Sequence, residues 1–466
     1  MNELRKEIVG VDEKLPLLNG EKRTYINFDN AASTPSLKRV LNKINEFMRF
    51  YSSIHRGTGF KSRLSSEMYE VAREKAGEFV DYDRNNHVVI FVKNTTEAVN
   101  KLSYRLDIPE DAVIIVSSME HHSNDLPWRR RAKVLHAPVN VENGTLDVDG
   151  LIKMIRENKD KLYLVSITGA SNVSGNVNPY HDIAREVHKV GAYIAVDGAQ
   201  LVPHKKLSMG KVGEPESIDF AFYSAHKMYA PYGTGVLIAR NDLMDTDRAP
   251  EYRGGGTVKV VTFDNVVWDD EPHIDEAGSP NVVGTIALAE AINFYNEMTY
   301  EKLDEIELTL AKKLLTEFQK RRDDVKVLGR SNPDDLENRL GVISFYVKDV
   351  PHSLVASVLA YEYGIGVRNG CFCAHPYLKL LLQISKEEDE KLIQEMIDGY
   401  KKNIPGAVRA SFGFYNLEEE VDTFVNALDW VIRNKDKIYD NYVLDERTGE
   451  YFPKNYKDDF SEFFKL

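Results

Sequence analysis

The sequence predicts an α/β fold with a mostly parallel sheet, and three observations indicate it. The 466 residues are too many for one ordinary domain, so two packed domains are expected. From about residue 85 to residue 240, short apolar runs alternate with longer amphipathic segments. Near-continuous apolar runs are typical of strands buried on both faces, and their alternation with helices is typical of a parallel sheet.

Six apolar runs are predicted to be strands, and we expect them to belong to a sheet of the seven-stranded type. They cover residues 88–92, 112–116, 162–167, 192–196, 220–223 and 235–239. Helical patterns lie between several of them, such as 180–190, which Gly191 ends. Ligands of such sheets bind at the carboxyl ends of the strands, so the residues directly after each run are the candidate site residues.

The pattern changes after about residue 290. A helix over 284–321 is followed by a strand at 341–347, a second helix, a loop with both cysteines, a strand at 407–412 and a helix from 417. We therefore expect a large domain of residues 31–290 and a smaller α+β domain of residues 291–466, to which residues 1–30 return. The segment 377–406 contains a charged helix, 386–402, which could be a surface helix, a lid, a dimer contact or a partner platform. The C-terminal tail is left without a role.

Composition excludes several classes of protein. The chain has 73 acidic and 60 basic residues and a net charge of −13, which argues against nucleic acid as its main partner. It has no run of 18 apolar residues and a charged beginning, so we expect no membrane span, no secretion and a cytoplasmic location. Cys371 and Cys373 are its two cysteines, too few for a disulfide framework or a four-cysteine zinc site. No metal is expected.

Two predicted strands end next to residues that together suit one cofactor. The strand at 192–196 ends at Asp197, and the strand at 220–223 runs into Ser224, His226 and Lys227. Either feature alone could be a turn aspartate or a surface lysine. Side by side, a lysine can form a Schiff base with pyridoxal 5'-phosphate while a carboxylate keeps the ring nitrogen protonated. The sequence therefore predicts a pyridoxal-phosphate site.

Two further strand ends could complete that site. Thr95 and Thr96 open a helix after the strand at 88–92, and hydroxyls and free N–H groups at a helix N-terminus can bind phosphate. The same residues could be a routine helix cap. His121 and His122 follow the strand at 112–116, where an imidazole could lie over the pyridine ring or cap a helix.

These stretches belong to a longer ordered set, and with it the chain resembles the class V aminotransferase family of fold-type I pyridoxal-phosphate enzymes. It looks most like the cysteine desulfurase and selenocysteine lyase branch of that family. The matching segments are 27–35, 55–57, 94–98, 120–124, 171–175, 196–200, 224–227, 254–256, 276–281, 367–374 and 408–411.

The resemblance implies a role for each matching residue. Lys227 would hold the cofactor and move a proton, Asp197 would pair with the ring nitrogen, and His122 would stack on the ring. The remaining cofactor contacts would come from Thr95, Thr96, Asn172, Gln200, Ser224, His226 and, across a homodimer interface, Ser279. Arg409, Asn172, His55 and Arg368 would bind an amino-acid substrate, although Arg409 could instead form a buried ion pair.

The branch assignment depends on the loop with the two cysteines. Arg368, Gly370 and Cys373 fit an Arg-x-Gly-x-x-Cys-Ala pattern, which implies that Cys373 takes sulfur from L-cysteine, or selenium from selenocysteine, as a persulfide and releases L-alanine. This chemistry also implies a partner protein that accepts the sulfur from Cys373. Cys371 and Phe372 replace histidines of well-studied relatives, and the Cys-Phe-Cys order is closer to molybdenum-cofactor sulfurases.

Three alternatives remain open from the sequence. Cys373 could be an inert buried cysteine, and the enzyme an aminotransferase, an epimerase or a carbon–sulfur lyase acting on another amino acid. The fold could also serve only as a scaffold for a partner. The part played by Cys371 is open as well.

Overall fold

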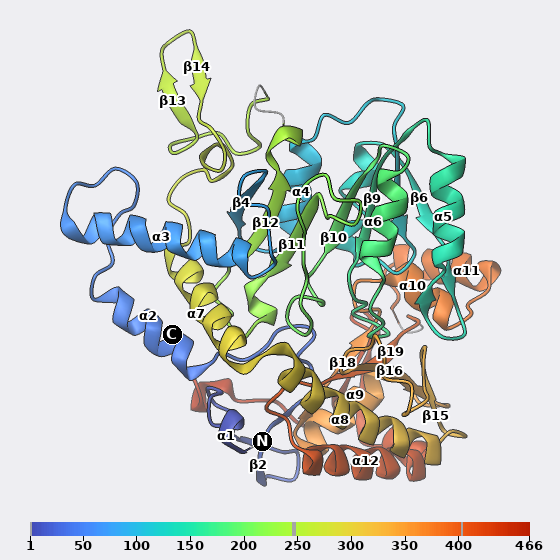
Figure 1. Cartoon of the computed structure of the whole chain (residues 1–466). Helices are drawn as coiled ribbons and strands as arrows, with labels where there is room; N and C mark the ends of the chain where they lie inside the picture. Colours follow the sequence, from blue (N-terminus) through green and yellow to red (C-terminus); the bar gives the residue numbers. More distant parts are fainter. Residues whose placement is uncertain (1, 245–247, 402–403) are drawn as a thin grey trace.

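The computed structural model describes residues 2–244, 248–401 and 404–466. At its centre is a seven-stranded sheet in the order β4-β12-β11-β10-β9-β5-β6 (Figure 1). Its strands are β4 (His87–Val92), β5 (Val113–Ser117), β6 (Lys133–Ala137), β9 (Leu162–Thr168), β10 (Tyr193–Asp197), β11 (Phe220–Ser224) and β12 (Gly235–Arg240). β12 runs antiparallel to both of its neighbours, and the other adjacent pairs are parallel. The predicted α/β class with a mostly parallel sheet is confirmed.

The six predicted strands are present, and the seventh, β6, was not predicted. β6 lies at the edge of the sheet, and its Lys133 and His136 are exposed. An edge strand has one unpaired side and does not need the continuous apolar run by which the central strands were recognised.

Helices cover both faces of this sheet because alternate residues of each strand point to opposite sides. On one face, Ala195 of β10 packs in a core with α4 (Thr95–Arg105). On the other face, Ile194 and Val196 pack in a larger core. The helices that contribute residues to that larger core include α2 (Lys38–Met48), α3 (Phe60–Glu78), α5 (Val148–Glu157), α6 (Tyr180–His188) and α7 (Val282–Met298).

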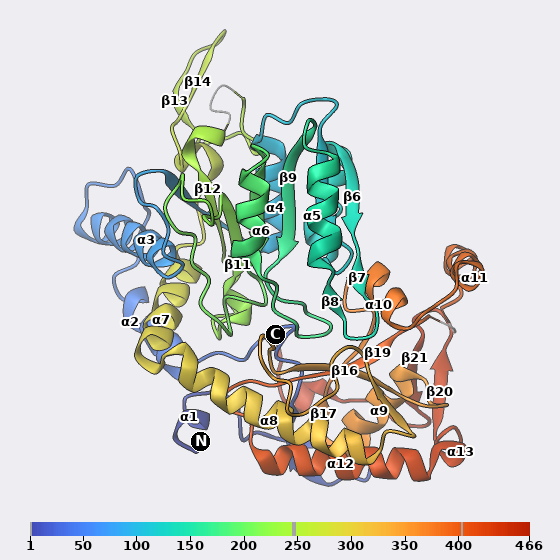
Figure 2. The same cartoon turned by 45° about the vertical axis from the view of Figure 1, so that its right-hand side comes forward.

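A second, antiparallel sheet of four strands follows in the order β15-β16-β19-β18. Its strands are β15 (Val325–Val327), β16 (Val342–Val347), β18 (Arg368–Gly370) and β19 (Ala407–Ser411), and the helices around it are α8 (Tyr300–Lys320), α9 (His352–Tyr363) and α12 (Glu418–Arg433) (Figure 2). The N-terminal β3 (Ile26–Asn27) pairs with β17 (Ile365–Gly366), and Phe28 lies in this core. Ile8 instead lies in the larger core. The domain boundaries remain a prediction.

The predicted helix over 284–321 is two helices in the structure. α7 ends at Met298 and α8 begins at Tyr300, and Thr299 between them has a φ of 61°. Neither glycine nor proline stands at this point, so the sequence carries no conventional sign of a break.

Several short elements lie outside the two sheets. A hairpin of β13 (Val258–Val261) and β14 (Val266–Trp268) projects from the large sheet (Figure 1). The segment after Cys373 forms α10 (His375–Leu381) and α11 (Lys386–Ile397), so the charged helix is shorter than predicted, and Lys402 lies outside the described residues. The chain ends in α13 (Lys435–Ile438), a hairpin of β20 (Tyr442–Asp445) and β21 (Glu450–Pro453), and a final 3₁₀ turn (Phe460–Glu462).

The other short elements are α1 (Asn2–Arg5), β1 (Lys14–Pro16), β2 (Lys22–Thr24), β7 (Val139–Asn140) and β8 (Thr145–Leu146). Among the described residues, every helix is too short or too polar to cross a bilayer.

Candidate active site

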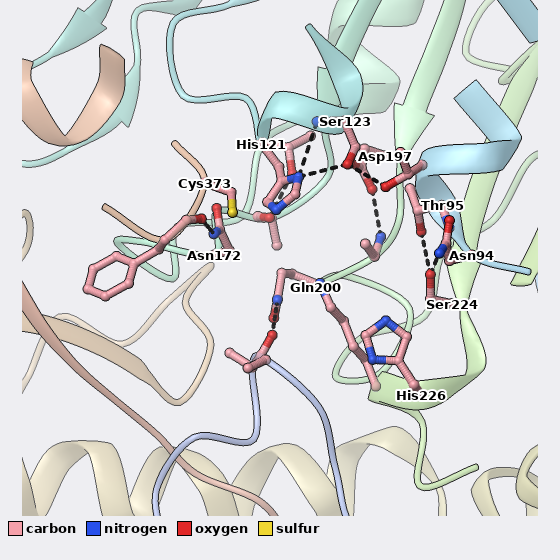
Figure 3. Close-up of a pocket in the computed structure, with 18 of the residues that line it drawn as sticks. Asn94, Thr95, His121, Ser123, Asn172, Asp197, Gln200, Ser224, His226 and Cys373 are labelled. Atoms are coloured by element: carbon pink, nitrogen blue, oxygen red, sulfur yellow. Dashed lines mark hydrogen bonds between the residues drawn. The ribbon is translucent and has the colours of Figure 1, made fainter. Parts of the chain in front are cut away.

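A cavity of about 220 Å³ opens at the carboxyl ends of the central strands (Figure 3). Most of the predicted site residues line it: Thr95, Thr96, Asn172, Asp197, Gln200, Ser224, His226, Lys227, Arg368, Cys373 and Arg409. One wall comes from the strand ends of the large sheet. The other comes from the loop with Cys373 and from Arg409 on β19, so the cavity lies between the two sheets.

Lys227 and Asp197 form the buried charged centre of the strand-end wall. β10 ends at Asp197, and the neighbouring β11 leads into a 3₁₀ turn that carries Lys227. Burial lowers the pKa of the Lys227 amine to about 8, which Asp197 opposes and Arg409 reinforces. Burial also raises the pKa of Asp197 above its ordinary value. An amine with a depressed pKa gives up its proton near neutral pH and can act as a nucleophile or base.

The amino end of α4 gathers hydroxyl groups at a second part of the same wall. Asn94 caps the helix by accepting a hydrogen bond from the Glu97 N–H (3.0 Å). The Thr95 N–H donates to Ser224 Oγ (2.9 Å), and the Thr95 and Ser224 hydroxyls are 2.7 Å apart. These groups lie at the positive end of the helix dipole, where a phosphate dianion is favoured.

Two more residues complete this polar corner. The Thr96 and Ser123 hydroxyls are 2.7 Å apart, which links α4 to the turn after β5. His226 lines the cavity, and burial and the Lys227 charge lower its pKa to about 4. His226 is therefore neutral at physiological pH, with no positive charge to add to the corner.

The structure corrects the prediction for the histidine pair: His121, not His122, lines the cavity. Its Nδ1 atom accepts a hydrogen bond from the Ser123 N–H (3.2 Å), and burial with the Lys227 charge lowers its pKa to about 3. His121 is thus a neutral ring facing the site. The His122 ring lies against His375, with the ring centres 4.7 Å apart.

Glu120, directly before the histidine pair, is buried. Its buried carboxylate accepts hydrogen bonds from the Thr168 N–H (2.8 Å), from Asn124 Nδ2 (2.7 Å) and from the Ser117 hydroxyl. These bonds fix the turn after β5 from both sides. Ser117 and Asn124 are near neighbours of Glu120 in the sequence, whereas Thr168 comes from β9, so one of the three bonds links the turn to a distant strand.

Cys373 lies on an unusual turn in the second wall. Phe372 and Cys373 have φ angles of 54° and 55°, a left-handed conformation that costs a non-glycine residue roughly 1–2 kcal/mol. Asn172 Nδ2 donates to the Phe372 carbonyl and the His122 N–H donates to the Cys373 carbonyl, both at 2.8 Å. Cys373 is exposed and its side chain reaches the cavity.

Cys371 lies on the other side of the same turn. Its thiol donates a hydrogen bond to the Pro405 carbonyl (2.9 Å), and it lines a separate pocket with residues of α10 and α11. Burial raises the pKa of Cys371 to about 11. This thiol therefore stays protonated at neutral pH and is a poor nucleophile.

Arg409 forms the base of the second wall and is fully buried. Its Nη1 atom donates to the Asn172 carbonyl and its Nη2 atom to Asp29 Oδ1, both at 3.0 Å. Asp29 Oδ2 is 3.8 Å from Arg368 Nη1, so one carboxylate lies between two cavity-lining arginines. Arg409 thus forms an ion pair with Asp29 and also lines the cavity, and its binding of a substrate carboxylate stays a prediction.

Gln200 offers a group that the protein itself does not use. Its Nε2 atom donates to the Ala31 carbonyl (2.7 Å). Its Oε1 atom is buried and has no hydrogen-bond partner among the described residues. Buried polar atoms are nearly always paired, so this oxygen points to a ligand in the cavity.

His55 and Ser279 do not line this cavity. They lie together in a separate hollow of about 520 Å³, with Arg56, Asp269, His273 and Glu276 among its other lining residues. The His55 and His273 rings are 5.4 Å apart, and burial together with His273 lowers the pKa of His55.

The cavity also contains residues that sequence reasoning did not select. Ser123, Thr168 and Phe372 line it, and the guanidinium carbon of Arg409 lies 5.1 Å from the centre of the Phe372 ring. Ser123 and Phe372 belong to matching segments of the sequence. Thr168 ends β9, and its position at a strand end was the signal that could have found it.

Comparisons with known proteins agree with this geometry. The family model described as aminotransferase class V matches residues 26–424. A cysteine desulfurase of Haloferax volcanii is 32% identical over 434 residues, which are 90% of this chain and 93% of that protein. A probable cysteine desulfurase of Xylella fastidiosa is also 32% identical, over 415 residues, 87% of this chain and 90% of that protein.

Solved structures give the same result. The apo structure of a cysteine desulfurase from Thermococcus onnurineus has a TM-score of 0.78 at 27% identity and covers 93% of this chain and 98% of its own. A cysteine desulfurase from Escherichia coli has a TM-score of 0.75 at 26% identity, with the same coverage. The chain belongs to the class V aminotransferase family, a family of enzymes that use pyridoxal phosphate.

The residues present fit that cofactor. The cavity brings together a buried lysine, a buried carboxylate, a cluster of hydroxyls at a helix N-terminus and an unpaired amide oxygen. This donor set suits an aldehyde, a pyridine nitrogen, a phosphate and a ring hydroxyl.

Proposed function

We propose that the chain is a cysteine desulfurase that converts L-cysteine, or selenocysteine, to L-alanine and keeps the sulfur or selenium on Cys373. One observation carries the proposal: Cys373 faces the cavity that Lys227 and Asp197 face from the opposite wall. The names of the relatives at 32% identity support it.

The proposal assigns the cofactor contacts to this chain's residues. Lys227 attaches pyridoxal phosphate, Asp197 pairs with its ring nitrogen, and His121, in place of His122, lies on its ring. Thr95, Thr96, Ser224 and His226 hold the phosphate, while Asn172 and the free Gln200 Oε1 atom lie near the ring hydroxyl. When bound, pyridoxal phosphate supplies an electron sink that weakens the bonds at the amino acid's α-carbon.

The substrate is bound from the second wall. Arg409 binds its carboxylate with a planar pair of N–H donors, and Arg368 adds positive charge at the cavity mouth. Lys227 Nζ takes the α-proton and returns a proton to the product carbon. Arg409 is held by Asn172 and Asp29, so the orientation of the substrate depends on both.

The sulfur step needs a thiolate. Cys373 loses its proton, and its sulfur attacks the sulfur of the substrate. A sulfur–sulfur bond forms while the carbon–sulfur bond of the substrate breaks, and the electron pair of that bond returns to the carbon, which is protonated to give alanine. Cys373 is left as a persulfide. A thiol of an acceptor protein then attacks the outer sulfur atom and takes it, and the Cys373 thiolate is released.

The proposal includes a homodimer in the cytoplasm. His55 and Ser279 lie in a hollow apart from the cavity of their own subunit, which supports a contribution of these two residues to the site of the second copy. Two domains, residues 31–290 and residues 1–30 with 291–466, provide the two walls. No nucleic acid or membrane partner is proposed.

The test is alanine release from L-cysteine under reducing conditions, with Cys373→Ala beside Cys371→Ala. Wild type and Cys371→Ala should both release alanine, and Cys373→Ala should be slower by at least about 100-fold because the attacking thiolate is lost. Equal release by wild type and Cys373→Ala would overturn the sulfur step and favour a carbon–sulfur lyase. No release by a cofactor-loaded wild type would favour an aminotransferase or epimerase on another amino acid.

A further inference from the structure

His122 lies outside the cavity and contacts the backbone on the far side of the catalytic thiol. The backbone N–H of His122 donates a hydrogen bond to the Cys373 carbonyl (2.8 Å). Its Nε2 atom accepts a hydrogen bond from the His375 N–H (3.3 Å). One residue therefore contacts both peptide groups that flank Ala374.

The second of these bonds replaces a missing helix cap. α10 begins at His375, and Ala374 before it has no side chain that could accept a hydrogen bond from the first turn. The imidazole of His122 supplies the acceptor from a distant part of the chain. Together with Asn172, which binds the Phe372 carbonyl, His122 fixes the backbone on both sides of Cys373.

These contacts matter because the two residues of the turn adopt a backbone conformation that is intrinsically unfavourable for them. Phe372 and Cys373 are both left-handed, and neither is glycine. A backbone of this kind persists only where its surroundings hold it. Loss of one of the holding contacts lets the turn relax and moves the thiol relative to Lys227.

The hold through Nε2 requires a neutral imidazole. An accepting Nε2 atom carries no hydrogen, so its proton is on Nδ1, and a doubly protonated ring has no acceptor. We propose that His122 is a positioning residue that holds the Cys373 turn through its neutral Nε2 atom, and that His122 and His375 together make this hold depend on pH.

The charged and titratable groups around the pair set the direction of the pH dependence. Burial, His375 and Arg129 lower the pKa of His122, and Asp125 opposes them. Burial and Lys379 lower the pKa of His375. Both lowered pKa values favour the neutral rings in the folded protein, so the hold is complete above the ordinary imidazole pKa of about 6.5 and is lost only as the pH falls through the lowered pKa of His122.

The experiment follows amide hydrogen exchange in residues 374–382 from about pH 8 down to about pH 4, corrected for the intrinsic rate, because the lowered pKa of His122 places its titration below the ordinary value of about 6.5. In wild-type holoenzyme, protection should fall by about fivefold at the lower pH, the effect of one hydrogen bond. His122→Ala should be poorly protected at both values. His122→Gln keeps an acceptor that does not titrate and should be equally protected at both.

His375→Ala is the matched control. It retains the backbone N–H that His122 binds, so protection at about pH 8 should equal that of wild type. It removes the neighbouring ring and exposes His122 to water, so protection should be lost at a higher pH than in wild type. Wild-type protection that does not change with pH, or a His122→Gln variant that loses protection on acidification, overturns the proposal. If His122→Ala does not fold, the comparison of wild type with His122→Gln still decides.

Alanine release gives a second readout, which depends on the proposed function. The ratio of the wild-type rate to the His122→Gln rate should fall from about one near pH 8 to about one fifth once the pH has fallen through the range in which wild-type protection is lost. A constant ratio overturns the effect on turnover. If no variant releases alanine, the proposed function fails, and hydrogen exchange alone decides the pH-dependent hold.

Discussion

The two walls of the cavity are built in different ways. The strand-end wall places Asp197 and Lys227 at the ends of neighbouring buried strands, where the backbone is fixed by the sheet. The opposite wall places Cys373 on a short turn whose left-handed backbone is held by Asn172 and His122. Under the proposed function, the residues that hold the cofactor would thus have a rigid support, while the sulfur-accepting thiol would depend on a few long-range hydrogen bonds.

The largest expected effect comes from the rigid wall. Under the proposed function, Lys227→Ala would remove both the attachment of the cofactor and the group that moves the α-proton, so alanine release should fall by at least about 1,000-fold. The measurement is the steady-state rate with added pyridoxal phosphate. An unchanged thermal unfolding curve shows that the variant is folded, and a folded variant with a rate within tenfold of wild type contradicts this assignment.

The pH dependence of cofactor uptake tests the same wall. Only the free amine of Lys227 attacks an aldehyde, and its pKa is lowered to about 8. Uptake of pyridoxal phosphate by the apoprotein should therefore rise by about tenfold per pH unit below about pH 8 and level off above it. Stopped-flow absorbance gives the rate. A rate that still rises steeply at about pH 10 would show an amine with an ordinary pKa.

A medium effect is expected in the opposite wall, where Asp29 orients Arg409. Asp29→Ala removes an acceptor for a charged donor, and the KM for L-cysteine should rise by about tenfold with a smaller change in kcat. Asp29→Asn retains an acceptor oxygen and should stay nearer to wild type. Equal KM values for wild type and Asp29→Ala would mean that Asn172 alone orients the arginine.

The smallest effect concerns the attachment of α10 to the large sheet. The buried hydroxyl of Tyr377 binds the Gly144 carbonyl and the Ser174 hydroxyl. Tyr377→Phe should lower the free energy of unfolding by about 1–2 kcal/mol and change alanine release by less than about twofold. Chemical denaturation measures the first quantity. A large loss of activity with unchanged stability would show that this contact also positions the Cys373 turn.

The same contrast explains what the sequence could predict. The strand ends were recognised because a buried strand is a local pattern, and the residues after it share one edge of the sheet. The cysteine was found by its motif. The contacts that hold its turn join residues about 200 or more positions apart, and no local pattern carries them.

Three differences between expectation and structure have the same origin. His121 rather than His122 lines the cavity, and two adjacent histidines in a sequence do not reveal which ring faces a site. The half-exposed edge strand β6 escaped detection because sheet pairing, rather than burial, defines it. His55 lies in a separate hollow rather than in the cavity, a placement that a motif match could not show.

The junction at Thr299 is a bend between α7 and α8 that the local sequence does not favour. A threonine with φ 61° and ψ 147° lies in a region nearly reserved for glycine, at a cost on the order of 1–3 kcal/mol. The helices on either side pack in different cores, α7 in the larger and α8 mainly in the smaller, and this packing keeps the bend. Neither glycine nor proline stands at this point of the sequence, so the bend is set by tertiary packing and not by the local sequence.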